Sequence, residues 1–209
     1  MLRAFGWLFL CLSVGVSANP PSTCTYSTYK WSVVQKKAVD FRTVSHPYAA
    51  LASYEIDKET GCTVCREDQR AIKVGDLPEV LVCKKLAGTL ETQLNALVVR
   101  EEPILKLVGY RVGMTRGDID TEGNRTRFSN HSFGIAIDIN DEQNGLYGNC
   151  MEFGPKCRLR KGGEWDPNIY GSLTVESEIV AAMKSLGLKW GGEIAGKQKD
   201  FMHFSPSGY

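Results

Sequence analysis

The sequence predicts an α+β fold in which a small antiparallel sheet is flanked by helices and stabilised by disulfides. Short strand-like runs and turns fill its first third, a long amphipathic helix pattern follows, and a second helix pattern lies far downstream. The chain has 209 residues, of which 43% are hydrophobic, which suits one domain with its own core. Lys and Arg number 25 against 24 Asp and Glu. Without a basic excess, we expect no nucleic-acid partner.

The first 18 residues have the pattern of a signal peptide. Arg3 provides a positive start, residues 4–16 are apolar, and Val16, Ser17 and Ala18 form a small-residue cleavage site. The alternative is an uncleaved anchor, but the apolar run is short for a membrane span. We therefore predict residues 1–18 as signal peptide and a secreted or periplasmic monomer with no membrane span. Residues 19–209 would form one domain, with a cysteine-bearing extension at 19–83 and a catalytic core at 84–209.

Six cysteines follow the predicted cleavage site, and an even number in an exported chain indicates disulfides. Cys150 and Cys157 flank a short loop, so we expect them to pair. The other four allow three pairings, and the spacing does not choose between them. The Cys-x-x-Cys spacing also resembles half of a zinc site or a redox pair, which stays as the alternative. These four residues are Cys24, Cys62, Cys65 and Cys83.

The secondary structure of the rest follows from periodicity. Apolar residues at helical spacing predict a helix over residues 84–99, after a β-branched strand run at 80–82. Strands are expected over 105–114 and 134–140, separated from the end of the chain by a loop-rich insertion at 141–171. A second helix is predicted over 175–186, with Thr174 as N-cap and Gly187 as the left-handed residue after it.

The strand predicted over 134–140 has an unusual face. Its three isoleucines alternate with Gly134, Ala136, Asp138 and Asn140, so small side chains lie beside a carboxylate. His131 precedes Asp138 by seven residues, an odd offset that would place the two on opposite faces of a straight strand. They converge only if the chain bends, which Gly134 permits.

A second polar segment ends the chain. Asp200 and His203 are three residues apart, where a loop enters a strand near Phe201. Open catalytic zinc sites use imidazole and carboxylate ligands and leave one position for water. His131, Asp138 and His203 would make such a set, with Asp200 as general base; the alternative is a turn carboxylate and a satisfied histidine.

Both segments resemble one family. The pattern Ser-x-His-x-x-Gly-x-Ala-x-Asp spans residues 129–138, and Asp-x-x-His spans 200–203. In this order they resemble the zinc D-alanyl-D-alanine carboxypeptidases and the related L-alanyl–D-glutamate endopeptidases, which share a zinc cradle with hedgehog signalling domains. The likeness covers roughly residues 84–205, without the insertion at 141–171.

The resemblance implies roles for individual residues. His131, Asp138 and His203 would hold one Zn²⁺, and Asp200 would move the proton. The family also keeps an arginine that binds the substrate carbonyl or carboxylate. Arg111, Arg116 and Arg127 are the candidates, and we favour Arg116, which precedes a Gly-Asp turn. Trp190 either lines the cleft behind His203 or is buried in the core.

The sequence therefore predicts an exported zinc metallopeptidase that hydrolyses peptidoglycan stem peptides, by carboxypeptidase or endopeptidase action. A non-catalytic zinc-holding binding module of the same fold is the alternative. Retention of Asp200 argues against it, because a structural zinc site needs no base. A disulfide-stabilised adhesion or inhibitor module without zinc is the third possibility.

Overall fold

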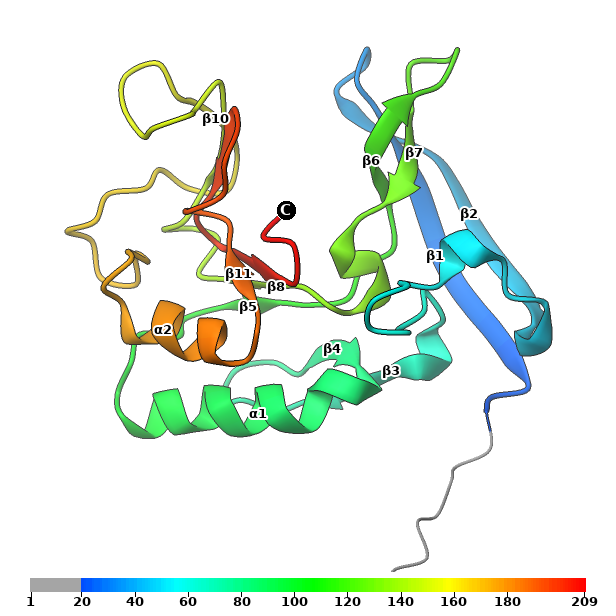
Figure 1. The fold of residues 1–209 in the computed structure, drawn as a ribbon, viewed down its shortest axis with the longest axis horizontal. Helices are drawn as coiled ribbons and strands as arrows, with labels where there is room; N and C mark the ends of the chain where they lie inside the picture. The colour runs from blue at the N-terminus through cyan, green and yellow to red at the C-terminus, as the bar shows by residue number, and fades with distance from the viewer. Residues whose placement is uncertain (1–19) are drawn as a thin grey trace, which may run out of the picture.

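The computed structural model describes residues 20–209, and the predicted signal peptide at 1–18 lies outside them. The fold is α+β, as predicted: helices α1 (Lys84–Val99) and α2 (Glu178–Ser185) lie below a set of short strands (Figure 1). In the described part of the chain, no helix combines the length and apolar character needed to cross a membrane.

The strands form four small sheets. One has the order β2-β1-β6-β7, made of β1 (Thr23–Ser32), β2 (Lys37–Pro47), β6 (Met114–Ile119) and β7 (Arg125–Phe128). The second is the central sheet, with the order β11-β13-β8-β5, made of β11 (Lys189–Trp190), β13 (His203–Ser205), β8 (Ile137–Ile139) and β5 (Leu107–Val108). The others are β10-β9-β12, made of β10 (Arg158–Lys161), β9 (Leu146–Gly148) and β12 (Gln198–Asp200), and the pair β3 (Gln69–Ile72) and β4 (Val80–Cys83). All paired strands are antiparallel except β1 and β6.

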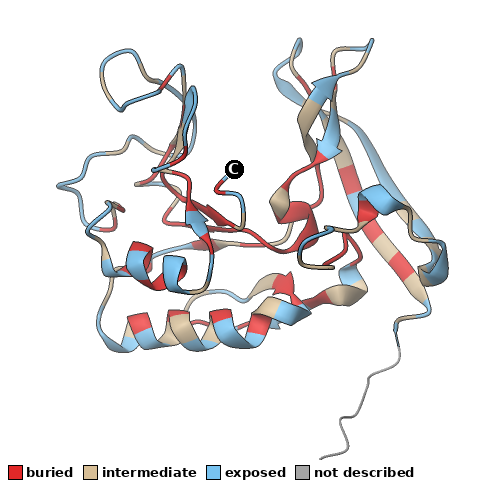
Figure 2. Cartoon of the chain, viewed as in Figure 1, coloured by how far each residue is buried: buried red, intermediate tan, exposed pale blue. Residues whose placement is uncertain are grey.

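The main core lies between the two helices and the central sheet. One face of each helix is buried against the isoleucines of β8 and against Phe204 of β13, which is fully buried. Figure 2 shows the buried residues gathered at this level, whereas the hairpin tips above it are exposed. Two lobes rise from this base (Figure 1), one formed by β9, β10 and β12 and the other by β1, β2, β6 and β7.

The predicted helices agree with the structure where their bounds depend on residues close together in the sequence. The helix over 84–99 has the predicted bounds, and Gly187 has the predicted left-handed conformation at φ +80°. The second helix begins at Glu178 rather than at 175, because Ser177 takes the N-cap position that we assigned to Thr174.

The strand predicted over 105–114 is wrong in its middle. Only Leu107 and Val108 pair with β8, and the next strand begins at Met114. Between these two strands the backbone forms hydrogen bonds with other segments: the Tyr110 amide donates to the Leu81 carbonyl, and the Arg111 amide donates to the His131 carbonyl. The strand predicted over 134–140 is likewise shorter, because only Ile137–Ile139 forms β8.

All six cysteines of the described chain form disulfides. Cys150 pairs with Cys157 as predicted, Cys24 pairs with Cys65, and Cys62 pairs with Cys83. The two cysteines of the Cys-x-x-Cys segment therefore belong to different disulfides, and the zinc or redox alternative is wrong. The extension also shares a second core cluster with the catalytic segment, in which Cys65 and Cys83 lie with Phe133 and Ile135.

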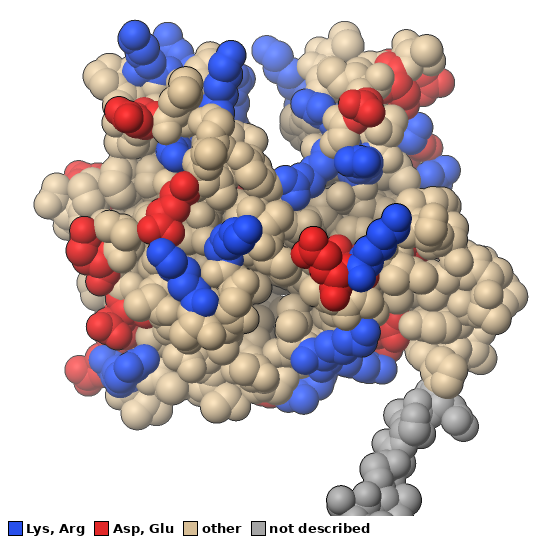
Figure 3. All heavy atoms as spheres, in the orientation of Figure 1, with Lys and Arg blue, Asp and Glu red and all other residues tan. Residues whose placement is uncertain are grey.

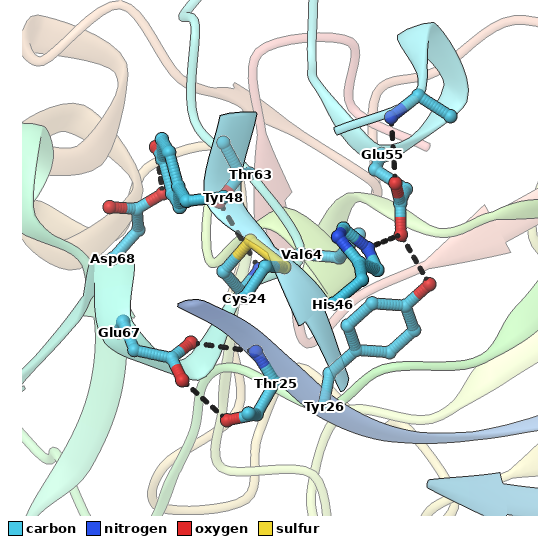
Figure 4. The surroundings of a disulfide bond; sticks show 12 residues. Cys24, Thr25, Tyr26, His46, Tyr48, Glu55, Thr63, Val64, Glu67 and Asp68 are labelled. Atoms are coloured by element: carbon cyan, nitrogen blue, oxygen red, sulfur yellow. Dashed lines mark hydrogen bonds and ion pairs between the residues drawn. A yellow bond between two sulfur atoms is a disulfide. The ribbon is translucent and has the colours of Figure 1, made fainter. Parts of the chain in front are cut away.

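Figure 4 shows a buried carboxylate beside the Cys24–Cys65 disulfide. Glu55 is 1% exposed and accepts hydrogen bonds from the Tyr26 hydroxyl at 2.6 Å and the Ala52 amide at 2.8 Å, and its Oε1 lies 3.0 Å from His46 Nε2. Burial disfavours its ionisation, but these donors lower the pKa of Glu55 overall. Hydrogen bonding to the Pro47 carbonyl and to Glu55 raises the pKa of His46.

We expect Glu55→Gln to lower the free energy of unfolding by about 1–3 kcal/mol, because buried donors lose a charged acceptor. The lowered pKa of Glu55 stabilises the fold above its ordinary pKa of 4.5, and this contribution is lost as the pH falls through the folded-state value. The raised pKa of His46 stabilises the fold below 6.5, and this contribution is lost as the pH rises through the folded-state value. The difference in Tm between wild type and variant should therefore be largest between pH 4.5 and 6.5. The exposed Glu59→Gln is the matched control, and equal Tm values for wild type and Glu55→Gln at pH 5.5 would contradict the expectation.

Candidate metal centre

Three elements bring the predicted ligands to one point. His131 lies on a short 3₁₀ helix, η4 (Asn130–Phe133), Asp138 lies at the middle of β8, and His203 begins β13. β8 and β13 are antiparallel neighbours in which Asp138 and His203 are directly opposite each other. Cross-strand partners place their side chains on the same face of a sheet, so this pair follows from the register alone.

Gly134 makes the bend that brings His131 to the same face. It has φ +66°, a left-handed conformation that ends η4 and turns the chain into β8. A Cβ at this position would lie 2.0 Å from the Gln69 side chain and 2.5 Å from the Cys83 amide nitrogen. Both the conformation and the space therefore require glycine, and the predicted bend is confirmed.

The ligand atoms of the three residues converge. His131 Nε2 and His203 Nδ1 each lie 2.9 Å from Asp138 Oδ1, and the two nitrogens lie 3.2 Å apart. All three residues are buried. Among the described residues, they form a group that could hold a metal ion.

The surrounding contacts orient these atoms. His131 Nδ1 lies 2.8 Å from the Gly109 carbonyl oxygen, which only accepts, so Nδ1 carries the proton and Nε2 offers its lone pair. Arg111 Nη2 donates to the other oxygen of Asp138 at 3.1 Å. Burial lowers the pKa of His131, which favours the neutral imidazole that a metal requires.

The charge balance of the cluster also favours a cation. Burial opposes ionisation of Asp138, but the adjacent imidazoles hold its pKa well below the ordinary value. Burial lowers the pKa of His203. The hydrogen bond to Asp138 outweighs this effect, together with the negative charges of Asp138 and Asp200 and the nearby main-chain oxygen of Tyr209, so that the pKa of His203 is raised overall. The buried Nε2 of His203 has no hydrogen-bond partner among the described residues.

The three residues fit Zn²⁺. Two imidazoles and one carboxylate are a donor set of catalytic zinc sites. Ligands about 2.0–2.1 Å from a tetrahedral zinc lie about 3.3 Å from each other, close to the 2.9–3.2 Å separations here. The spacing and the donors together are those of an open zinc site.

Asp200 lies beside this cluster at the end of β12. Its backbone is held between strands, since its amide donates to Gly191 and it pairs in register with Leu146 of β9. The Oδ1 atom is buried without a hydrogen-bond partner among the described residues. Burial, opposed by the charge of His203 and assisted by the Asp138 carboxylate, raises the pKa of the Asp200 carboxyl to about 6. Such a carboxyl can gain and lose a proton near neutral pH.

The three candidate arginines occupy different places. Arg111 contacts Asp138 and has a buried Nε with no partner in the described chain. Arg116, on β6, donates from Nη1 to the main-chain oxygen of Tyr209 at 2.7 Å, and burial lowers its pKa. Arg127, opposite Arg116 on β7, is exposed. The choice of Arg116 as the substrate-binding arginine stays a prediction.

Two features of the site were not expected from the sequence. The insertion at 141–171 supplies β9, which pairs with β12 and so positions Asp200. The side-chain amide of Asn130 donates hydrogen bonds to Ser205, Ser207 and Tyr209, which follow His203 in the sequence. The position of Asn130 next to His131 in the first motif was the signal that the sequence offered. Of the two positions predicted for Trp190, the structure shows the one in the core, since Trp190 is 4% exposed and donates to the Phe201 carbonyl.

Comparison with known protein families also indicates a peptidase. Residues 122–206 match a protein family described as D-alanyl-D-alanine carboxypeptidase. No curated protein and no solved structure matches the chain. The match spans both motifs and all three clustered residues, and it supports the zinc peptidase family that the motifs resemble.

Proposed function

We propose that this chain, as a member of the D-alanyl-D-alanine carboxypeptidase family, is an exported zinc metallopeptidase that hydrolyses amide bonds in peptidoglycan stem peptides. The observation that carries the proposal is the cluster of His131, Asp138 and His203 with the buried, unpartnered Oδ1 of Asp200 beside it. The family match over residues 122–206 supports peptidase activity.

The residues divide the chemistry between binding a metal and moving a proton. His131 Nε2, Asp138 Oδ1 and His203 Nδ1 would hold Zn²⁺, which supplies Lewis-acid polarisation of a carbonyl oxygen and of a water. Asp200 Oδ1 accepts the proton of the attacking water and returns it to the leaving amine nitrogen. A pKa of about 6 suits both steps.

The cleft suits a substrate with negative charge. Figure 3 shows a notch between the two lobes, with Lys and Arg side chains on both sides of it. Arg116 lies on the β6 side, and β10 contributes Arg158, Arg160 and Lys161 on the other lobe. The chain as a whole has a formal charge of only +1, so this basic character is local. Stem peptides carry several carboxylates, which such a cleft attracts.

The disulfides support a location outside the cytoplasm. Three pairs in a chain of this size are typical of oxidising compartments. We propose that the protein is secreted or periplasmic and acts as a monomer.

Purified sacculi test the function directly. Wild-type protein loaded with zinc should release peptide or amino-acid fragments identifiable by mass spectrometry, and the chelated protein should release none until zinc is restored. The identity of the fragments distinguishes loss of a terminal D-Ala from cleavage between L-Ala and D-Glu. If the zinc-loaded protein binds sacculi but releases nothing, the non-catalytic binding module is the better description.

A further inference from the structure

The cysteine-bearing extension contributes to a groove beside the metal centre. The groove has a volume of about 530 Å³. Small-molecule sites usually measure about 300–1,000 Å³, so the groove has room for a ligand. Its lining comes from β1, β2, the 3₁₀ helix η3 (Arg66–Asp68) and residues 110–112. Arg111 belongs to this lining and also donates to Asp138, so the groove adjoins the metal centre.

The strands line the groove mostly with hydroxyl groups. Side chains along β1 alternate between buried and accessible, and Thr25, Ser27 and Tyr29 are accessible. Thr43 of β2 lies opposite Ser27 and is exposed. Hydroxyl groups both donate and accept hydrogen bonds. No carboxylate lines the groove in the described part of the chain. Its lining therefore suits a ligand rich in hydroxyl groups rather than a cation.

Phe41 gives the groove an exposed aromatic face. The register of β1 and β2 shifts between Thr28 and Lys30, and the Tyr29 and Phe41 rings lie beside each other with centres 5.7 Å apart. Phe41 is nevertheless 73% exposed, although burial of an aromatic side chain is strongly favourable. Tyr29 thus contacts the Phe41 ring and leaves most of it open to a ligand. The flat, apolar C–H face of a sugar ring can stack on such a surface.

A peptide strand added to β1 is a poorer match for this groove. Such a peptide needs free backbone groups along the edge of β1 that faces away from β2. The Thr25 amide donates at 2.9 Å to Glu67, and the Thr25 hydroxyl donates at 2.6 Å to the same carboxylate (Figure 4). Glu67 therefore occupies a backbone donor that an added strand would use. The hydroxyls of Ser27 and Thr43 lie 3.0 Å apart and share one hydrogen bond, which leaves capacity for a ligand.

From this arrangement we infer that the groove binds a sugar ring of the glycan strand to which the stem peptide is attached. The ring stacks on Phe41, and its hydroxyls bond to Ser27 and Thr43. The exposed Arg66 offers donors to a carbonyl or carboxylate substituent of the sugar. The inference rests on the proposed function, because it makes glycan and stem peptide parts of one substrate. It follows that the protein should prefer stem peptides that are still attached to their sugar.

Calorimetric titration with triacetylchitotriose, a soluble oligomer of an acetylated amino sugar, tests the groove directly. Wild-type protein should bind it, and Phe41→Leu should bind about tenfold more weakly, because leucine is apolar but has no flat face. Phe41→Tyr keeps the ring and should bind as wild type does. The exposed Tyr170→Leu is the matched control and should also keep the wild-type affinity. Equal affinities of wild type and Phe41→Leu, or no binding by wild type, would overturn the inference.

Kinetic measurements test whether the groove serves the substrate. In wild type, kcat/KM for a stem peptide attached to its disaccharide should exceed that for the free stem peptide by about tenfold. This ratio should fall toward one in Phe41→Leu and stay at the wild-type value in Phe41→Tyr. A ratio of one in wild type would contradict the inference. So would a loss confined to the free peptide in Phe41→Leu, because it would assign the groove to the peptide.

The binding measurement requires neither zinc nor hydrolysis, so it separates this inference from the proposed function. Oligosaccharide binding that depends on Phe41, in a protein that hydrolyses no stem peptide, would support the groove and contradict the enzymatic proposal. Release of fragments from sacculi by a protein that binds no oligosaccharide would overturn the inference and leave the proposed function standing.

Discussion

His203→Ala is expected to lose bound zinc and peptidase activity together. Only His131 and Asp138 would then remain of the three converging ligand atoms, and two ligands hold zinc weakly compared with the three of an open catalytic site. Activity should fall to the uncatalysed background, the largest effect that we expect of any single change. Metal analysis of the purified variant, at about one zinc per chain for wild type, measures the first loss, and stem-peptide hydrolysis measures the second.

His46→Ala is the matched control, because the third histidine of the chain lies in the extension beside Glu55. It should keep its zinc and its activity. If His203→Ala retained stoichiometric zinc, the assignment of the three ligands would be wrong.

Asp200→Asn is expected to keep its zinc and to lose about 10²–10⁴-fold in kcat, the usual contribution of a positioned base. The amide has the shape of the carboxyl but no basicity. Asp138→Asn should instead weaken zinc binding, because a neutral amide is a poorer ligand and the contact with Arg111 loses its charge. Zinc content and stem-peptide hydrolysis, measured for both variants in parallel, distinguish ligand from base.

Added zinc sharpens the comparison. Excess zinc should restore part of the activity of Asp138→Asn and none of that of Asp200→Asn. Full activity in Asp200→Asn would remove the proton-transfer role and would favour the non-catalytic, zinc-holding module.

The sequence predicted those parts of the fold that depend on neighbouring residues. The helix over 84–99 follows from apolar spacing, and Gly187 ends the second helix because glycine adopts the left-handed conformation at little cost. The Cys150–Cys157 disulfide was also predictable, because its two cysteines are only seven positions apart in the sequence. The strand over 105–114 was not, because the hydrogen-bond partners of Tyr110 and Arg111 lie in distant segments.

For the candidate site, the residue types and their order in the sequence determined the set of His131, Asp138, His203 and Asp200, since histidine and carboxylate are the donors that zinc chemistry requires. Only the tertiary structure decided how they meet. The register of β8 and β13 places Asp138 opposite His203, and the insertion at 141–171, through β9, positions Asp200. It also decided the pairing of Cys24 with Cys65 and brought Arg116 and Asn130 to Tyr209. These are contacts between residues far apart along the chain, and their geometry depends on the packing of whole elements, which no local pattern encodes.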